Sequence, residues 1–530
     1  MVLAGARRTS AVGPRERRAG RGALPVLLGV AVVAAGCVAL AAGGCVKVEP
    51  FACTSTSACV RAGEPGTCEP TGWCSFPDPS CASGWRYGAG AGGGLADACV
   101  EGSRPPADGG QDAAPDAGGD AEPVDAKVDT TPCSEGALSC DGDNLTRCSQ
   151  GVPEVAATCV MGCLALGSDA RCYTFSPHNV AEATLTAGTY EWVITTSTDV
   201  TTAGANVPAA VGRTTATQAG GARDLVILTV RSLWVKPSVI LRFTGTMAVV
   251  IVASDHILVE GVIDVSGSGT TAGPGGWRGG NAANDGSAPT GATGAPAGAT
   301  SGNGEDTGGS GGCFGAVGGS GGPAGSAAGP GPGTVFGTTS LAPLFGGGGG
   351  GGGGGWAGGG EGGGGGGALP LAAGVRIDVT GIVIAAGCGG GRGLASLTFG
   401  AAGGGGAGGG ILVEAPIVAV TGVLAANGGG GGGAAYQAQG AGATGTSGQP
   451  NGTPAPGGEG GSSNDPTIGA GGAGGAGTTG AEPGHAGGGG SPNGGGGGGG
   501  VGRIAVYSRS GAAPGGTCSP PPAAASLAPK

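Results

Sequence analysis

The chain carries the same nine-residue phrase three times, and each copy runs into glycine. The copies are VEGVIDVSG (Val259–Gly267), VTGIVIAAG (Val379–Gly387) and VTGVLAANG (Val420–Gly428). All three fit the pattern V-x-G-[VI]-[ILV]-x-[AV]-x-G. A chain rarely repeats such a phrase unless the copies stack on one another, so the repeat predicts an extended, repetitive architecture.

Each copy predicts a strand, a bend at glycine and a second strand, because apolar residues alternate on both sides of the glycine. The copies align Gly261, Gly381 and Gly422 at the bend, and Ile257, Ile377 and Val418 in the strand before it. Glycine at such a bend permits a positive φ or a close approach of another backbone segment. We therefore expect the three glycines to be structural and the three aliphatic residues to stack inside successive coils.

The strands favour a mainly β fold, specifically a right-handed parallel β-helix, whose coils bury small stacked aliphatic side chains. Counting back from the bend glycine aligns Val250 and Val252 of the first copy with Ile411 and Val413 of the third. A partial fourth unit follows at Val501–Ser508. An ordinary antiparallel sandwich is the alternative that such strands also permit.

Long glycine-rich insertions, at residues 268–368, 388–410 and 428–502, separate the repeats. From Gly346 to Gly367, 19 of the 22 positions are glycine. Glycine has the largest backbone entropy to lose and no side chain to bury, which favours a flexible linker. The other interpretation is ordered polyglycine II, with three residues per turn and backbone groups bonded between neighbouring segments.

The N-terminus predicts export. Six arginines precede an apolar run from Ala23 to about Ala42, which is typical of a signal peptide over residues 1–44. Small residues precede Cys45 and Cys37, as in the bacterial lipobox, where the cysteine is lipidated. We predict lipidation at Cys45, with Cys37 as the alternative site, and a plain secretory signal or an uncleaved anchor as the alternatives to a lipoprotein.

Twelve cysteines form two sets of six near the N-terminus. They are Cys53, Cys59, Cys68, Cys74, Cys81 and Cys99, and then Cys133, Cys140, Cys148, Cys159, Cys163 and Cys172. In an exported chain these sets predict disulfide-rich modules at residues 45–100 and 133–172, with the pairing left open at 15 possibilities per set. The spacings lack the C-x2-C pairs of zinc sites. Residues 101–132 between the modules are acidic and rich in proline, which predicts a disordered tether.

Two phrases in the modules carry a resemblance. CSFPDPSCASGWRY (Cys74–Tyr87) resembles a module near the N-terminus of predicted surface lipoproteins of gliding soil bacteria, and RCYTFSPHNVA (Arg171–Ala181) is similar to another module of these proteins. That family is Cys-rich, glycine-rich and essentially uncharacterised, so the resemblance implies a surface location and no activity. The glycine-rich composition also resembles glycine-rich domains of some animal receptor kinases, and transfers no functional residue.

Catalytic chemistry has few candidates here. The three histidines, His178, His256 and His485, lie far apart in the sequence, and the repeated G-x-S-x-G matches fall in glycine-rich segments without a strand–helix frame. Acids close to the predicted coils are Asp255, Glu260, Asp264, Asp378 and Glu414, with Arg242 as a basic neighbour. Asp264 aligns with Ile384 and Ala425, so no acidic ladder is expected. We predict no catalytic residue, no cofactor site and no metal site.

Charge restricts the partners. Removing residues 1–44 takes six arginines and one glutamate from totals of 24 basic and 35 acidic residues, which leaves a net charge of −16. This balance argues against nucleic acid and against anionic membrane surfaces as partners. We expect an exported protein of the outer membrane or cell surface, held to the membrane through its lipid, with a cell-surface polysaccharide or protein as its partner.

The expected role is structural or adhesive. In this division of the chain, residues 173–508 form the β-helical, glycine-rich domain and residues 509–530 a disordered tail. Two alternatives stay open. One is a carbohydrate-active β-helix enzyme, either a lyase or a hydrolase, which requires several acids on adjacent coils. The other is a protein that binds its partner through the Cys-rich modules.

Overall fold

The computed structural model describes residues 133–529, apart from short gaps at 167–168, 302–303, 356–357, 396–399, 437–439 and 489–492, and parts of residues 53–100. The chain divides into two compact units, Met1–Asp125 and Ala126–Lys530, and each is described by itself. The expected signal peptide 1–44, both candidate lipidation cysteines, Cys37 and Cys45, and the linker 101–132 lie outside the described residues.

The first unit contains a small disulfide-linked sheet. Its strands are β1 (Val60–Arg61), β2 (Glu64–Pro65), β3 (Thr67–Cys68), β4 (Cys74–Pro77) and β5 (Trp85–Tyr87), of which β3, β4 and β5 form one antiparallel sheet. The disulfides are Cys53–Cys68, Cys59–Cys74 and Cys81–Cys99. Phe76 and four cysteines make up its hydrophobic cluster. A core this small does not hold a fold by burial alone, so the cross-links stabilise it.

The second cysteine set forms a similar module within the second unit. Its strands are β6 (Leu138–Asp141), β7 (Asn144–Ser149), β8 (Val152–Thr158), β9 (Cys163–Leu166) and β10 (Asp169–Cys172). The disulfides are Cys133–Cys148, Cys140–Cys163 and Cys159–Cys172. Each of the six disulfides joins two cysteines of the same set, three in the first set and three in the second. Such a number of disulfides indicates an extracytoplasmic protein, because the cytosol keeps thiols reduced.

The rest of the second unit is built on three stacked sheets. Sheet 1 consists of β11 (Glu191–Ile194), β15 (Ser232–Val235), β18 (His256–Val259), β21 (Arg376–Val379) and β24 (Ile417–Val420). Sheet 2 consists of β12 (Thr198–Thr201), β16 (Ile240–Thr244), β19 (Val262–Asp264), β22 (Ile382–Ile384), β25 (Val423–Ala425) and β27 (Thr517–Ser519). Sheet 3 consists of β13 (Gly212–Ala216), β14 (Leu225–Val230), β17 (Ala248–Ala253), β20 (Ala368–Ala373), β23 (Gly410–Glu414), β26 (Arg503–Ser508) and β28 (Ala523–Ser526).

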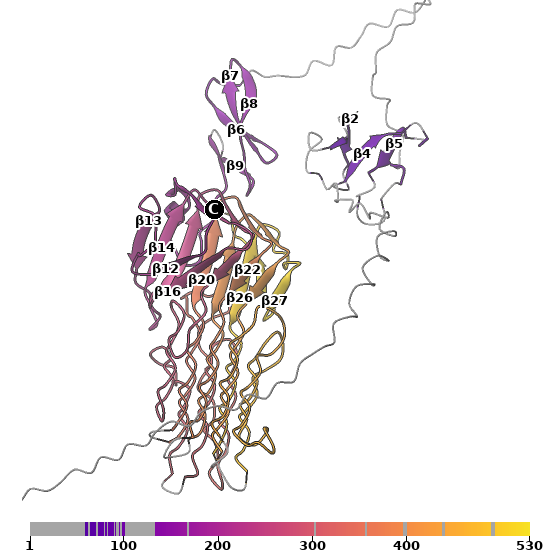
Figure 1. Cartoon of the computed structure of the whole chain (residues 1–530). Helices are drawn as coiled ribbons and strands as arrows, with labels where there is room; N and C mark the ends of the chain where they lie inside the picture. The colour runs from indigo at the N-terminus through magenta and orange to yellow at the C-terminus, as the bar shows by residue number, and fades with distance from the viewer. Residues whose placement is uncertain are drawn as a thin grey trace, which may run out of the picture. The chain divides into compact units, whose positions relative to one another are not determined.

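Successive coils place one strand in each sheet, and all neighbouring strands in the three sheets run parallel except β13 and β14. The chain passes from sheet 3 to sheet 1 and then to sheet 2 before it starts the next coil. Strands of sheets 2 and 3 are labelled in Figure 1. A short 3-10 helix, η2 (Glu182–Thr186), precedes the first coil. The prediction of a mainly β, β-helix-like fold behind disulfide-rich modules is confirmed.

The repeated phrase marks the turn from sheet 1 to sheet 2. Ile257 pairs with Ile377 and Ile377 with Val418, so these side chains stack along the interior as expected. At the bend, a Cβ on Gly422 would lie 2.0 Å from the carbonyl oxygen of Gly381. Neither glycine has a positive φ. Close stacking of successive coils, and not a left-handed backbone, therefore requires glycine at these bends.

The register of sheet 3 differs from the alignment by counting. Hydrogen bonds pair Ile251 with Leu371 and Leu371 with Val413, whereas the count from the bend glycine aligns Val252 with Val413. The connection from β23 to its bend is one residue shorter, nine positions from Val413 to Gly422 against ten in the coil before it. Both faces of the central strands β17, β20 and β23 are buried, so hydrophobic alternation does not identify the inner face of sheet 3.

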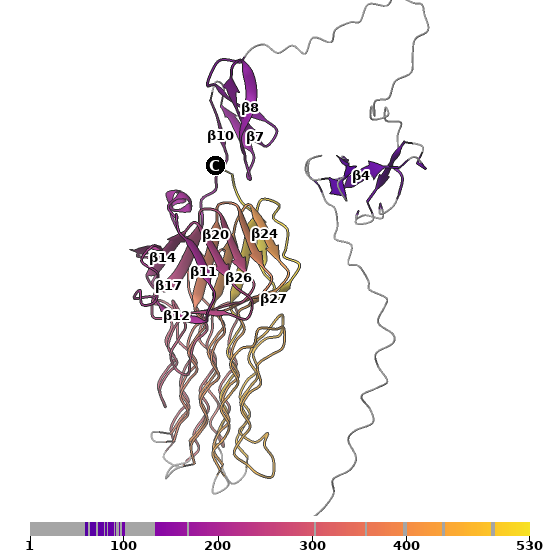
Figure 2. The same ribbon diagram turned by 45° about the horizontal axis from the view of Figure 1, so that its top comes forward.

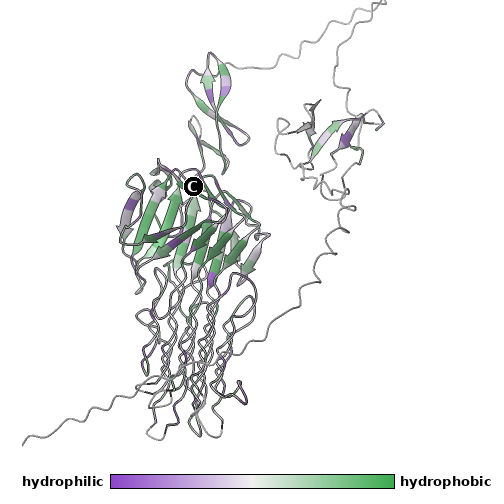
Figure 3. Ribbon diagram, in the orientation of Figure 1, coloured by the Kyte–Doolittle hydropathy of each residue, from purple (hydrophilic) through white to green (hydrophobic). Residues whose placement is uncertain are grey.

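Two hydrophobic clusters meet across sheet 3. One fills the interior of the coils, and the other lies on the outer face of sheet 3, where Phe314, Leu341, Leu344 and Phe345 of the first insertion cover the strands. In Figure 3 most strands of the three sheets are hydrophobic, while the insertions are close to neutral. The first insertion is therefore anchored to the β-helix by four large side chains, and most of its length has almost none.

The glycine-rich insertions are ordered segments that run side by side. Each of the three leaves a strand of sheet 2 and returns to a strand of sheet 3, and the segments extend from one side of the sheets (Figure 2). In the central segment, residues 347–354 donate their N–H groups in rotation to segments 360–366, 307–313 and 284–287. The pairs are Gly347–Gly366, Gly350–Gly363 and Gly353–Gly360, then Gly348–Cys313, Gly351–Ser310 and Gly354–Thr307, and finally Gly349–Ser287 and Gly352–Asn284, at 2.8–3.2 Å.

This pattern has a period of three residues, which matches the three residues per turn of the polyproline II conformation. A Cβ on any residue from Gly349 to Gly353 would lie 1.9–2.3 Å from a carbonyl oxygen of a neighbouring segment. The backbones are thus packed so closely that only glycine fits. Of the two interpretations of the insertions, these contacts favour the ordered one and contradict a flexible linker for the described residues.

The C-terminal residues also differ from expectation. Residues 509–530, expected to be a disordered tail, contain β27 and β28, which pair with β25 and β26. The segment is rich in alanine and proline and has no apolar alternation, so the sequence offered no strand signal. Its order comes from the open end of the β-helix, whose last strands supply unpaired backbone groups.

Candidate functional site

The acids named from the sequence are spread over the β-helix, and each has its own partner. Glu260 accepts a hydrogen bond from Trp234 Nε1 at 2.7 Å, Asp378 pairs with Arg376 at 2.6 Å and Asp255 lies 3.4 Å from His256. Within the described residues, these three acids do not converge on one pocket. Asp264 pairs in register with Ile384, and Ile384 with Ala425, so no acidic ladder forms along these coils.

The fifth acid, Glu414, is buried and binds the segment before the first coil. Both its oxygens accept from the backbone N–H of His178, at 3.2 and 3.3 Å, and one also contacts His178 Nδ1. The imidazole stacks on Tyr507, with the ring centroids 4.4 Å apart. The hydrogen bond to Glu414 raises the pKa of His178. This cluster fastens the N-terminal segment to the last strands of sheet 3, which is a structural task.

A charge ladder lies on the outer face of sheet 2. Asp199 of β12 pairs in register with Arg242 of β16, and Arg242 with Asp264 of β19. Arg242 Nε lies 3.5 Å from Asp264 Oδ2, and the other Asp264 oxygen accepts from the N–H of Ser266 at 2.8 Å. Neighbouring strands are about 4.8 Å apart, so in register Arg242 stands between Asp199 on one adjacent strand and Asp264 on the other.

The start of the first insertion converts this ladder into a pocket of about 230 Å³. Its wall is a tight turn in which Ser268 and Thr271 exchange backbone hydrogen bonds of 2.8 and 3.0 Å, with Gly269 at φ +57°. The turn is joined to the glycine segments through Gly273, whose N–H donates to Gly365 at 2.9 Å. Thr244 also lines the pocket. The pocket is therefore fixed between a sheet and the ordered insertions.

Several polar groups of the pocket are available to hydrogen-bond a ligand. Within the described part of the chain, no side-chain hydrogen bond engages the Asp199 carboxylate or the hydroxyls of Thr244, Ser268 and Thr271. The guanidinium of Arg242 has five N–H donors and one long contact. The pocket thus offers donors and acceptors side by side.

The thiol of Cys388 lies near the pocket, with Sγ 2.8 Å from the place that a Cβ on Gly267 would occupy. Burial raises the pKa of this thiol to about 12, which keeps it protonated and unreactive. Cys313 and Cys388 are free and buried, and Cys518 is free and half-buried.

Sequence reasoning named Arg242 and its ion-pair partner Asp264 but missed the other residues that line this pocket. Asp199 lies on β12, a strand outside the repeated phrase, and its partners become visible only when the coils are aligned. Ser268 and Thr271 are two small polar residues in a low-complexity segment that is full of them. A coil-by-coil alignment of sheet 2 is the signal that would have found Asp199.

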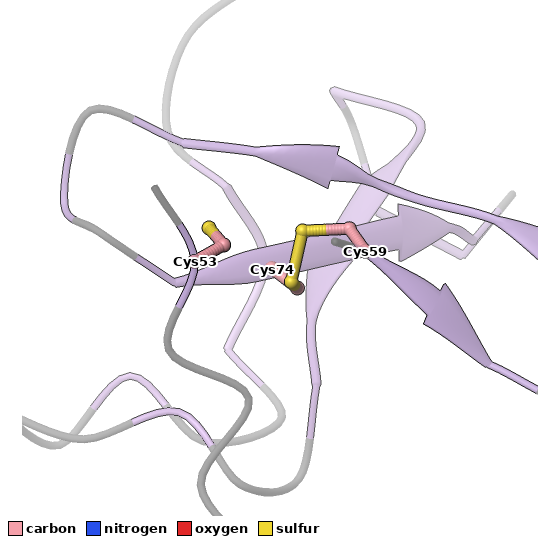
Figure 4. A group of neighbouring side chains, drawn as sticks. All are labelled: Cys53, Cys59 and Cys74. Atoms are coloured by element: carbon pink, nitrogen blue, oxygen red, sulfur yellow. A yellow bond between two sulfur atoms is a disulfide. The ribbon is translucent and has the colours of Figure 1, made fainter. Parts of the chain in front are cut away.

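Three cysteines of the first module approach one another as metal ligands do. The sulfur atoms of Cys53, Cys59 and Cys74 lie within 4.8 Å of one another, and Figure 4 shows the Cys59–Cys74 disulfide beside Cys53. Cys53 is bonded to Cys68. Metal binding requires thiolates, and disulfide sulfurs do not supply them. These contacts are a consequence of neighbouring disulfides.

No helix among the described residues is long and apolar enough to span a membrane. Comparison with protein-family profiles, curated proteins and solved structures found no match to this chain.

Proposed function

We propose that this chain is a cell-surface protein with a structural or adhesive role and no catalytic activity. In this proposal the chain is exported and anchored through a lipid on Cys45, and the tether 101–132 separates the membrane from the second unit. The coils wind in a right-handed sense, as parallel β connections almost always do, and the glycine segments are polyglycine II helices.

The observation that carries the proposal is the backbone lattice around residues 346–355. Every third N–H group of this segment donates to the same neighbour, and the neighbours bond onward to further segments. A lattice of this kind is rigid and almost free of side chains, because a Cβ on Gly351 would lie 2.2 Å from the carbonyl oxygen of Pro296. Such an element suits holding and presenting surfaces. Its central segment, residues 346–355, is glycine throughout and so contributes no titratable side chain.

The disulfides support the location. Two modules of three disulfides precede the β-helix, and proteins of oxidising compartments use such modules. The net charge of the full chain, −11, supports a partner other than nucleic acid. Of the two alternatives, a carbohydrate-active enzyme keeps one supporting feature, the acids that flank Arg242. A purified chain that cleaves a surface polysaccharide would favour it.

The test combines anchoring with adhesion. Metabolic labelling with an alkyne fatty acid is expected to tag the full chain and the Cys37→Ser variant but not the Cys45→Ser variant. Cells of the producing bacterium that lack the chain are expected to lose attachment to one another or to a surface, and the full chain is expected to restore it. Loss of labelling in Cys37→Ser alone would assign the lipid to Cys37. If cells that lack the chain attach normally both to one another and to a surface, the adhesive role is rejected.

A further inference from the structure

We propose that the pocket on sheet 2 binds a neutral sugar ring of a surface glycan. This inference rests on the proposed adhesive function and adds the class of ligand to it. The polar residues that line the pocket are Asp199, Arg242, Thr244, Ser266, Ser268 and Thr271, and Asp264 lies beside it as the ion-pair partner of Arg242.

The charges select against ions. A cation near either carboxylate would also lie close to the Arg242 guanidinium, since the three side chains alternate on adjacent strands. An anion at the guanidinium would lie between Asp199 and Asp264. Like charges so close together are unfavourable, and the more so where protein surrounds them. The ladder therefore disfavours free metal ions, phosphate and uronic acids alike.

A polyol satisfies the same groups. Each sugar hydroxyl donates one hydrogen bond and accepts others, so it can donate to a carboxylate while it accepts from the guanidinium. Arg242 and Asp264 are well placed for this, because they lie 3.5 Å apart and share adjacent register positions. Hydrogen bonds to charged groups are stronger than those between neutral groups. The hydroxyls of Ser268 and Thr271 extend the donor and acceptor set along the wall.

The volume limits the ligand to a small one. At about 230 Å³ the pocket is smaller than the roughly 300–1,000 Å³ of sites for drug-sized molecules. One sugar ring, and not a long oligosaccharide, matches this size. The pocket is also preorganised, because the turn at residues 268–271 is hydrogen-bonded internally and joined to the glycine lattice.

The test uses the full chain and five probes in saturation-transfer difference NMR: glucose, galactose, mannose, glucuronate and glucosamine. At least one neutral hexose is expected to bind more tightly than both charged sugars. Arg242→Met, which keeps most of the side-chain stem, is expected to weaken this binding about tenfold or more, as the loss of one charged hydrogen bond implies. Asp199→Asn, on an exposed side chain, is expected to weaken it without disturbing the fold.

The matched control is Arg231→Met. Arg231 is also a strand-associated arginine paired with an acid, Glu191, but it lies beside sheet 1. It is expected to leave sugar binding unchanged, and thermal melts check that all three variants fold. Tighter binding of glucuronate or glucosamine, equal binding by Arg242→Met, or no binding of any neutral hexose would overturn the proposal.

The adhesion assay separates this inference from the proposed function. If no hexose binds but the chain still restores attachment, the pocket assignment fails and the adhesive role stands. If a hexose binds but attachment never depended on the chain, the adhesive role fails and the pocket assignment stands. If both proposals hold, the full chain binds a hexose and the Arg242→Met variant restores less attachment than the full chain does.

Discussion

Replacing Gly351 with alanine tests the glycine lattice at its centre. The new Cβ would lie 2.2 Å from the carbonyl oxygen of Pro296 and 2.9 Å from that of Ala295, so the two segments must separate by about 1 Å. Gly351 also donates to Ser310 at 2.9 Å and accepts from Gly404 at 2.8 Å. Separation therefore strains two buried backbone hydrogen bonds as well as the packing.

The expected cost follows from these two effects. Overpacking a close-packed interior costs about 1–3 kcal/mol, and a buried backbone group left without a partner costs about 1–3 kcal/mol. Alanine also lowers the conformational entropy of the unfolded chain, which stabilises the folded state by about 0.4–1 kcal/mol. We expect Gly351→Ala to destabilise the second unit by about 2–4 kcal/mol, measured as a lower unfolding midpoint in calorimetry and in urea with the disulfides intact.

Gly480 supplies the matched control in the third insertion. No atom lies within 4 Å of the Cβ that an alanine would add there, and its φ is not positive. Gly480→Ala is therefore expected to be neutral or to stabilise by about 0.4–1 kcal/mol through the unfolded state. The two alanines should shift the midpoint in different directions. Equal shifts of the unfolding midpoint at both positions would refute the close-packed lattice and favour a flexible linker.

Three further outcomes are expected. Gly422→Ala should lower stability by about 1–3 kcal/mol in the same melts, because its Cβ would lie 2.0 Å from the Gly381 carbonyl oxygen; an unchanged midpoint would contradict close stacking. Peptide mapping without reduction should find six disulfides confined to the two cysteine sets, and a bond between the sets would contradict the division. Hydrogen bonding to Glu414 raises the pKa of His178, so its stabilisation should be complete below about pH 6.5 and lost as pH rises through the raised pKa. His178→Gln should flatten this pH dependence of the melting temperature, and an unaltered slope would exclude the contact as its cause.

The repeated phrase predicted the β-helix because its residues have one physical task. Ile257, Ile377 and Val418 stack inside, and the glycine of each copy accommodates the coil below. Both requirements act on single positions at a fixed spacing, so they remain visible in the sequence. The central strands of sheet 3 lack this signal because both their faces are buried, one against the interior and the other under Phe314 and its neighbours. The sequence pattern therefore did not reveal that the connection from β23 to its bend is one residue shorter.

The order of the insertions was not decidable from composition, for a related reason. A glycine-rich composition fits both a flexible linker and an ordered lattice. The two states differ in whether neighbouring segments form hydrogen bonds with one another's backbone N–H and C=O groups. Gly351 shows the difference, since its partners Ser310 and Gly404 lie 41 and 53 positions away in the sequence. The pocket has the same origin: Asp199 and Arg242 meet only because coils stack, and Thr271 reaches them only because the lattice fixes the turn that carries it. In this chain the site is therefore a product of the stacking itself, and a change that loosens the lattice near Gly273 is expected to weaken sugar binding without touching a polar group of the pocket.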